Sequence, residues 1–216
     1  MRKLSHLIAA LLWVAPAALG QEPAPIKPTQ PIELFNGRDF DGWKLFLPDP
    51  TADVTKTWSV ADGLLRCTGQ PAGYMRTLAR YRDYRLHVEW RWPANPGNNG
   101  VLVHVQLPDK VWPKMIECQL MNQNAGDIWI IETTFREHKE RGQDRRTPKL
   151  GPANEKPLGE WNSYDIVANG DTLVLSVNGK VMNIATQCEL SDGYICLQSE
   201  GAPIEFRNVR LTPLDG

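Results

Sequence analysis

The chain has 216 residues, of which 42% are hydrophobic and 23% are charged, and its formal net charge is −1. This length suits one domain with enough chain to bury a core. A nearly neutral chain without a basic stripe argues against nucleic acid as a partner.

Residues 1–20 have the pattern of a secretory signal peptide. The basic start MRKLSH is followed by the apolar run LIAALLWVAPAAL and by small residues around Ala18. The apolar run is shorter than the roughly 20 residues that span a bilayer, so it does not predict a membrane anchor. Removal of the whole signal peptide would leave 22 basic and 25 acidic residues. We expect an exported protein, periplasmic or extracellular, without a membrane span.

The segment 21–31, which includes EPAPIKPTQP, is rich in proline and predicts a disordered linker. A domain over 32–216 follows, built of short alternating runs between turn residues, which is typical of an all-β sandwich or barrel. The charged stretch 136–159 is expected to be a solvated loop or a lid. The candidate strands are 58–60, 64–68, 84–92, 100–106, 115–121, 128–131, 161–168, 172–177, 180–184, 193–198 and 204–211.

The four cysteines all follow the signal peptide, and export would permit disulfides. Cys67 and Cys118 lie in apolar strand patterns and are expected to be buried thiols. Cys188 and Cys196 flank the turn Ser191-Asp192-Gly193. The sequence is compatible both with a disulfide between them and with two free thiols.

The run VLVHVQLPDKVWPKMIECQLM, which begins at Val101, predicts a hairpin of two alternating strands. A slip of one residue would turn an apolar face to solvent, so the apolar faces must match. The matching register sets Val103 against Cys118 and His104 against Glu117, although a slip of two residues stays open. Trp112 and Lys114 in the connecting loop are expected to overhang the polar face.

The preceding strand, YRLHVEWRW, has a polar face that carries Glu89 and Arg91. Pairing it with the hairpin in the same way predicts a row Glu89–His104–Glu117, with Arg91 in the same row as Gln119. Side chains opposite one another in a sheet have Cβ atoms about 5 Å apart. The plain alternative is a solvated ion-pair row without function.

Further polar residues are candidates for the same surface. Gln198 and Glu200 in GYICLQSEG point away from the apolar face of their strand, and Arg207 does so in IEFRNVRL. An exposed tryptophan such as Trp112 beside hydrogen-bonding groups suits a sugar ring. We therefore expect a carbohydrate site whose substrate-binding residues are Glu89, Arg91, Trp112, Lys114, Gln119, Gln198, Glu200 and Arg207.

Four motifs carry a resemblance to a known family. LFNGRDFDGWK, GNNGVLVHVQ with WPKMIECQLMNQNAGDIW, EWNSYDIVANGDTLVLSVNGK and GAPIEFRNVRL occur in the family's order. On them the chain resembles the 3-keto-disaccharide hydrolases. The resemblance covers nearly all of residues 32–214 and places the Glu-x-Gln motif of the family on Glu117 and Gln119. It implies a concanavalin-A-like jelly-roll sandwich of two antiparallel sheets that cleaves glycosides whose sugar is a ketone at carbon 3.

Glucanases of this fold use two carboxylates on one strand face, whereas this strand supplies Glu117 alone. A 3-keto sugar permits another route, in which a base removes the acidic hydrogen at carbon 2 and the enolate expels the group at carbon 1. His104 or Glu117 is the candidate base, and Arg91 or Lys114 the candidate partner of the enolate. A divalent metal held by His104 with Glu89 or Glu117 is an alternative electrophile.

Two other function classes stay open. One is a carbohydrate-binding module that uses the same face without catalysis, and the other is a purely structural exported sandwich. The oligomeric state is open as well.

Overall fold

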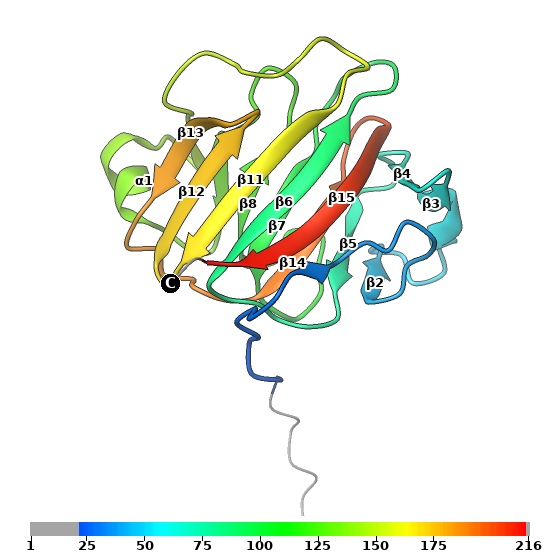
Figure 1. The fold of residues 1–216 in the computed structure, drawn as a ribbon, viewed down its shortest axis with the longest axis horizontal. Coiled ribbons are helices and arrows are strands. Elements are labelled where there is room, and N and C mark those ends of the chain that lie inside the picture. The colour runs from blue at the N-terminus through cyan, green and yellow to red at the C-terminus, as the bar shows by residue number, and fades with distance from the viewer. Residues whose placement is uncertain (1–21, 215–216) are drawn as a thin grey trace, which may run out of the picture.

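The structure, a computed structural model, describes residues 22–214, so the predicted signal peptide and Gln21 lie outside the described residues. Two antiparallel β-sheets pack face to face, which confirms the predicted all-β sandwich (Figure 1). Within this range the regular helices are α1 (Arg136–Arg141) and the 3₁₀ turn η1 (Val54–Lys56). No helix in residues 22–214 is long and apolar enough to cross a membrane.

The first sheet, which we call the β6 sheet, faces the viewer in Figure 1. The second, the β8 sheet, lies behind it. The β6 sheet has the order β13 (Lys180–Ala185), β12 (Thr172–Val177), β11 (Asn162–Asn169), β6 (Tyr84–Arg91), β15 (Ile204–Pro213), β4 (Leu64–Cys67) and β3 (Trp58–Ala61), and β1 (Ile32–Glu33) also pairs with β15. The β8 sheet has the order β10 (Arg146–Thr147), β9 (Ile128–Ile131), β8 (Met115–Gln119), β7 (Gly100–Val105), β14 (Tyr194–Ser199), β5 (Gly73–Thr77) and β2 (Trp43–Phe46).

The core lies between the two sheets and comes from the apolar faces that the alternation predicts. Val88 and Trp90 of β6 meet Val101 and Val103 of β7 in one buried cluster. The hairpin between β12 and β13 turns at Asn178 and Gly179, whose φ angles of 49° and 77° suit asparagine and glycine. Alternation and turn chemistry thus locate most of the strands, while β1, β2, β5 and β10 are found only in the structure.

The predicted order of strands around the hairpin is wrong in one respect. β7 does pair with β8, but β6 pairs with β11 and β15 in the other sheet. The segment between β6 and β7 is therefore a crossover between sheets. Gly97 within it packs so tightly that an added Cβ would lie 2.3 Å from the Cβ of Ala202. The row Glu89–His104–Glu117 cannot form, because its first member belongs to the opposite layer.

The prediction of a disordered linker is also wrong for residues 22–31. Ile26 donates its backbone N–H to Arg80 at 2.8 Å and accepts from Arg82 at 3.0 Å. Pro28 is buried, and Glu22 forms a salt bridge of 2.9 Å with Arg80. The proline-rich segment forms no regular strand, but it still packs against the domain.

All four cysteines are buried free thiols. Cys188 belongs to the core between the sheets, whereas Cys196 belongs to a second apolar cluster on the outer face of the β8 sheet. The pair that flanks the turn therefore lies on opposite faces of one sheet and does not form the disulfide left open by the sequence.

Candidate functional site

Strand β8 presents its alternate side chains to the outer face of the β8 sheet. Met115, Glu117 and Gln119 point outward, while Ile116 and Cys118 enter the core. Across the sheet, Glu117 lies opposite Leu102 of β7 and Trp129 of β9. The observed register is the two-residue slip, so Leu102 occupies the place predicted for His104.

A pocket of about 290 Å³ opens on this face. It combines carboxylates, amides, one guanidinium and two indole rings. Its lining residues are Asn98, Trp112, Met115, Glu117, Gln119, Met121, Trp129, Ile131, Arg145 and Glu200. A concave site with apolar walls and a few converging polar groups is the usual form of a small-molecule site.

Gly100 makes room for the central carboxyl. A Cβ added at this position would lie 2.5 Å from Oε1 of Glu117 and 2.7 Å from its Cγ. The Glu117 carboxyl group therefore lies directly over the glycine on β7. Gly100 is required by this close approach, since any larger residue would push the carboxyl group away.

Two polar atoms at this site have no hydrogen-bond partner within residues 22–214. They are Oε1 of Glu117 and Oδ1 of Asn98, and both are shielded from solvent. Buried polar groups in folded proteins are almost always paired, so such unpaired groups need a reason. A bound ligand that supplies the missing hydrogen-bond partners would explain them.

The pKa of Glu117 is raised to about 8, mainly by burial and also by the nearby Glu200, while Arg145 acts in the opposite direction. Burial also raises the pKa of Glu200, partly offset by Asn98 and Gln198. The side chain of Glu117 is buried, whereas that of Glu200 is only half-buried. The pocket therefore holds two carboxyl groups that resist ionisation, and Glu117 retains its proton at neutral pH.

The predicted site residues on this face fall into three groups. Trp112, Gln119 and Glu200 line the pocket as expected. Gln198 lies on the same face, opposite Tyr74 of β5. Lys114 is absent from the lining, so the structure does not bring it into the pocket.

His104 does not belong to this site, which corrects its prediction as catalytic residue and metal ligand. A β-bulge between β7 and β14 gives it a φ of 53°, and its ring turns into the core, 6.2 Å from the ring of Tyr84 on β6. Its Nδ1–H donates to the carbonyl of Leu190 at 3.0 Å. Burial lowers the pKa of His104 to about 4. The extra residue of a bulge reverses which face a side chain joins, and an alternating pattern does not reveal it.

Because His104 and Glu117 lie on opposite faces of the β8 sheet, they cannot bind one metal ion. Within residues 22–214, no three His, Cys, Asp or Glu side chains gather closely enough to hold a metal.

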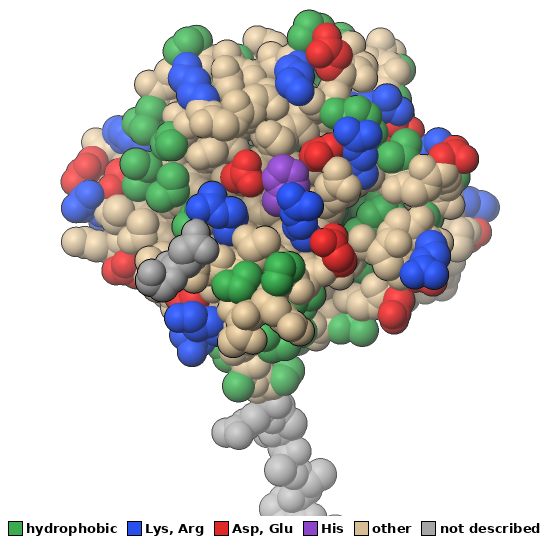
Figure 2. Space-filling model, viewed as in Figure 1, with side chains coloured by type: hydrophobic (Ala, Val, Ile, Leu, Met, Phe, Trp, Pro, Cys, Tyr) green, Lys and Arg blue, Asp and Glu red, His purple; other side chains and the backbone are tan. Residues whose placement is uncertain are grey.

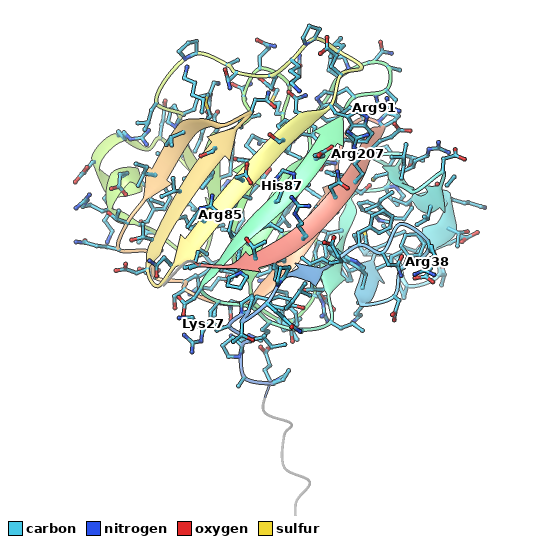
Figure 3. The ribbon with its side chains drawn as sticks, viewed as in Figure 1. Lys27, Arg38, Arg85, His87, Arg91 and Arg207 are labelled. Atoms are coloured by element: carbon cyan, nitrogen blue, oxygen red, sulfur yellow. The ribbon has the colours of Figure 1, made fainter. Side chains whose placement is uncertain are left out.

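Glu89 also lies elsewhere, on the outer face of the β6 sheet, where its strand pairs with β15. Arg91 and Arg207 lie on the same face (Figure 3). Glu89 accepts hydrogen bonds from Arg207 at 2.6 Å and Asn208 at 2.9 Å. Arg91 donates to Glu205 at 2.7 Å. Figure 2 looks onto this face and shows acidic and basic groups interspersed around a histidine, which Figure 3 labels as His87. The prediction that these residues join Glu117 is wrong, because their strands form the other layer.

Six pocket residues escaped the sequence analysis, among them the apolar strand residues Met115 and Ile131. Asn98 precedes β7 in the motif GNNG, and Trp129 resembled an ordinary strand residue. Met121 follows the end of β8. Arg145 comes from the charged stretch after α1, where mixed charges gave no signal, and its guanidinium lies 5.8 Å from the centre of the Trp129 ring.

Comparisons with known proteins find a matching family and related folds. Residues 30–212 match a family described as the 3-keto-alpha-glucoside-1,2-lyase-like domain. A 3-keto-disaccharide hydrolase of Bacteroides thetaiotaomicron is 22% identical, covering 85% of this chain and 78% of the relative.

Solved structures share the jelly-roll fold. A Parabacteroides distasonis protein, provisionally named a glycosyl hydrolase, has a TM-score of 0.65 at 25% identity and covers 86% of this chain and 94% of its own. The β-glucanase of Bacillus licheniformis has a TM-score of 0.59 at 13% identity, covering 85% of this chain and 97% of its own. A carbohydrate-binding module of Bacillus subtilis has a TM-score of 0.57 at 12% identity, and the match covers 78% of this chain and 94% of its own.

Proposed function

Because the chain belongs to the 3-keto-alpha-glucoside-1,2-lyase-like family, we propose that it cleaves 3-keto-glycosides in the pocket around Glu117. Its relatives make it a hydrolase-like enzyme with a carbohydrate substrate. The observation that carries the proposal is the Glu117 carboxyl group, which is buried in a pocket and has an oxygen unpaired within residues 22–214.

The two carboxyl groups of the pocket suit the acid and the base of an elimination. Enzymes commonly divide these roles between groups whose surroundings separate their pKa values. Glu200, the less buried of the two, acts as the base and removes the hydrogen at carbon 2 of the sugar. The ketone at carbon 3 takes up the electrons as an enolate, whose charge the guanidinium of Arg145 stabilises.

The second step breaks the glycosidic bond. The enolate electrons form a double bond between carbons 1 and 2 and restore the ketone, and the bond from carbon 1 to the glycosidic oxygen breaks. Glu117 gives its proton to the departing oxygen. Water then adds its hydroxyl to carbon 1 and a proton to carbon 2, and the result is net hydrolysis. Trp112 packs against the apolar face of the sugar ring.

Solvent deuterium tests this route. We expect the purified protein to release p-nitrophenol from p-nitrophenyl 3-keto-α-glucoside and to leave the unoxidised glucoside intact. In D₂O, early product should carry deuterium at carbon 2. Product incubated separately with the enzyme controls for later exchange.

Release of the aglycone with hydrogen retained at carbon 2 would contradict the elimination. A non-catalytic carbohydrate-binding module, the competing function, would bind the 3-keto-glucoside and leave it intact.

We also propose that the enzyme acts outside the cytoplasm, as residues 1–20 predict. Deleting these residues should move the activity from the exported fraction to the cytoplasmic one.

A further inference from the structure

Glu200 lies at a junction where three connections pass from one sheet to the other. They are residues 68–72 between β4 and β5, residues 92–99 between β6 and β7, and residues 200–203 between β14 and β15. An added Cβ would lie 2.5 Å from the backbone of Ala202 at Gly69 and 2.3 Å from the Cβ of Ala202 at Gly97. Gly201 donates its backbone N–H to the carbonyl of Gly69 at 2.9 Å. Because the three connections pack this closely, the main chain at Glu200 is held in one place.

Two amide side chains lie near the carboxyl group of Glu200. Asn98 comes from the crossover before β7, and an added Cβ at Gly201 would lie 3.4 Å from its backbone nitrogen. Gln198 belongs to β14 and precedes Glu200 by two residues on the same outer face. Both amide groups lower the pKa of Glu200, against the larger and opposite effect of burial. Two separate segments of the chain therefore supply groups that favour the ionised form of Glu200.

Gln198 stands in apolar surroundings. Its side chain is 1% exposed and does not line the pocket. Tyr194 and Cys196 on the same face of β14, and Tyr74 opposite it on β5, form part of the outer apolar cluster. Neither amide atom of Gln198 has a hydrogen-bond partner among residues 22–214. An apolar side chain would fill this place at lower cost in free energy, so the amide group needs a functional explanation.

The carboxyl group of Glu200 provides that explanation. The amide of Gln198 is near enough to lower the pKa of this group, although the two do not form a complete hydrogen bond within the described chain. Hydrogen bonds of catalytic groups are often long before substrate binds, and they shorten in the complex with substrate. A buried donor can hold one carboxylate oxygen in place and leave the other free to accept a proton from the sugar.

We propose that Gln198 is a positioning residue, whose amide N–H holds the Glu200 carboxylate in the orientation that removes the hydrogen at carbon 2 and which does not itself contact the substrate. This inference rests on the proposed function, in which Glu200 is the base. Asn98 supports the same carboxylate from the pocket lining. The charged groups that line the pocket with Glu200 are Glu117 of β8 and Arg145 from the stretch after α1. Loss of the Gln198 donor leaves both charges in place, so its effect on Glu200 can be measured alone.

Gln198→Met tests the proposal, because methionine keeps the length of the side chain and removes both amide atoms. Carbon-13 NMR of protein labelled at glutamate side-chain carboxyls, with Glu200→Gln to assign the signal, follows the titration of Glu200. Loss of a donor disfavours the ionised form, so the titration should move to higher pH by about one unit, the scale of a hydrogen bond to a charged group. Gln198→Leu, the second variant, should give the same shift. An unmoved titration in both variants would overturn the proposal.

Kinetics distinguish positioning from contact with the substrate. With p-nitrophenyl 3-keto-α-glucoside, kcat should rise with pH as Glu200 ionises, and Gln198→Met should move this acid limb upward by the same amount as the titration. At the wild-type optimum, kcat should fall about tenfold because the base is misplaced. KM should stay within about twofold, since Gln198 does not touch the sugar. A raised KM with an unmoved acid limb would make Gln198 a substrate-binding residue and overturn the proposal.

Ser199→Ala is the matched control. Ser199 is buried between Gln198 and Glu200 in the chain, and its hydroxyl donates to the carbonyl of Pro71 at 2.9 Å, away from the pocket lining. This variant should leave both the titration of Glu200 and the acid limb in place. Equal shifts in Ser199→Ala and Gln198→Met would mean that any loosening of β14 has this effect, and would overturn the role of the amide.

The titration separates this inference from the proposed function, because it requires no turnover. If the protein leaves the 3-keto-glucoside intact, a titration that still moves in Gln198→Met supports the hold of Gln198 on Glu200 although the proposed reaction fails. If the protein cleaves the compound and Glu200→Gln retains full turnover, Glu200 is not the base, and the positioning role is overturned.

Discussion

The outer face of the β8 sheet and the outer face of the β6 sheet both carry carboxylates, but their surroundings are opposite. On the β6 sheet, burial raises the pKa of Glu89, yet hydrogen bonds from Asn208 and Arg207 outweigh it and the net pKa is lowered. On the β8 sheet, burial raises the pKa of Glu117 to about 8. Charges matched by neighbours stabilise a fold, whereas a buried carboxyl group left unpaired is characteristic of a site that acts on a ligand.

The largest expected difference between the two faces is in turnover. Glu117→Gln should lower turnover of p-nitrophenyl 3-keto-α-glucoside by about a hundredfold or more, the usual scale for losing a general acid or base. Glu89→Gln is the matched control and should stay near wild type. Circular dichroism would verify the fold of both. Equal losses in the two variants would remove the distinction between the faces.

Gly100→Ala tests whether the position of the Glu117 carboxyl group matters. The new Cβ would occupy the space of Oε1, so the carboxyl group must move. We expect turnover to fall about tenfold or more, because small displacements of a catalytic group are costly. Gly151→Ala is the control, since its Cβ would meet only Nζ of Lys180, at 3.8 Å. Unchanged turnover in Gly100→Ala would contradict the assigned position.

Stability should depend on pH with opposite signs at the two carboxylates. The folded-state pKa of Glu117 is raised from about 4.5 to about 8, so its stabilising contribution is full below pH 4.5 and is lost as pH rises to about 8. The folded-state pKa of Glu89 is lowered, so its contribution is present above pH 4.5 and is lost as pH falls through the lowered value.

Urea unfolding between pH 3 and pH 9 measures both effects. In Glu117→Gln the free energy of unfolding should decline less steeply toward alkaline pH than in the wild type. In Glu89→Gln it should decline less steeply toward acid pH. Identical pH profiles for the two variants would contradict the difference in pKa.

The smallest expected effect comes from the ion pairs of the β6 sheet. Arg207→Ala removes the bond to Glu89 and a guanidinium that lies 4.0 Å from the centre of the Trp161 ring. A partly exposed pair contributes up to about 1 kcal/mol, so the free energy of unfolding should fall by no more than that. Turnover should not change. A large loss of turnover would assign this face a role in catalysis.

The sequence predicted the strands well because alternation and turn residues are local signals. It also identified Glu117, Gln119, Trp112 and Glu200, which the structure gathers in one pocket. It failed where the arrangement depends on distant contacts. The pattern of β6 does not reveal that the chain changes sheets before β7. The bulge that turns His104 into the core depends on the pairing of β7 with β14, far along the chain. Arg145 reaches the pocket through the fold of a loop that has no periodic pattern.

A titration of the Glu117 carboxyl group tests the central claim most directly. Carbon-13 NMR of protein labelled at glutamate side-chain carboxyls, with Glu117→Gln to assign the signal, would report its protonation from pH 4 to pH 10. The account predicts a pKa of about 8, so that the group is still protonated at neutral pH. A pKa near the ordinary value of 4.5 would contradict it, because Glu117 would then be an ionised carboxylate with no proton to give to the leaving group.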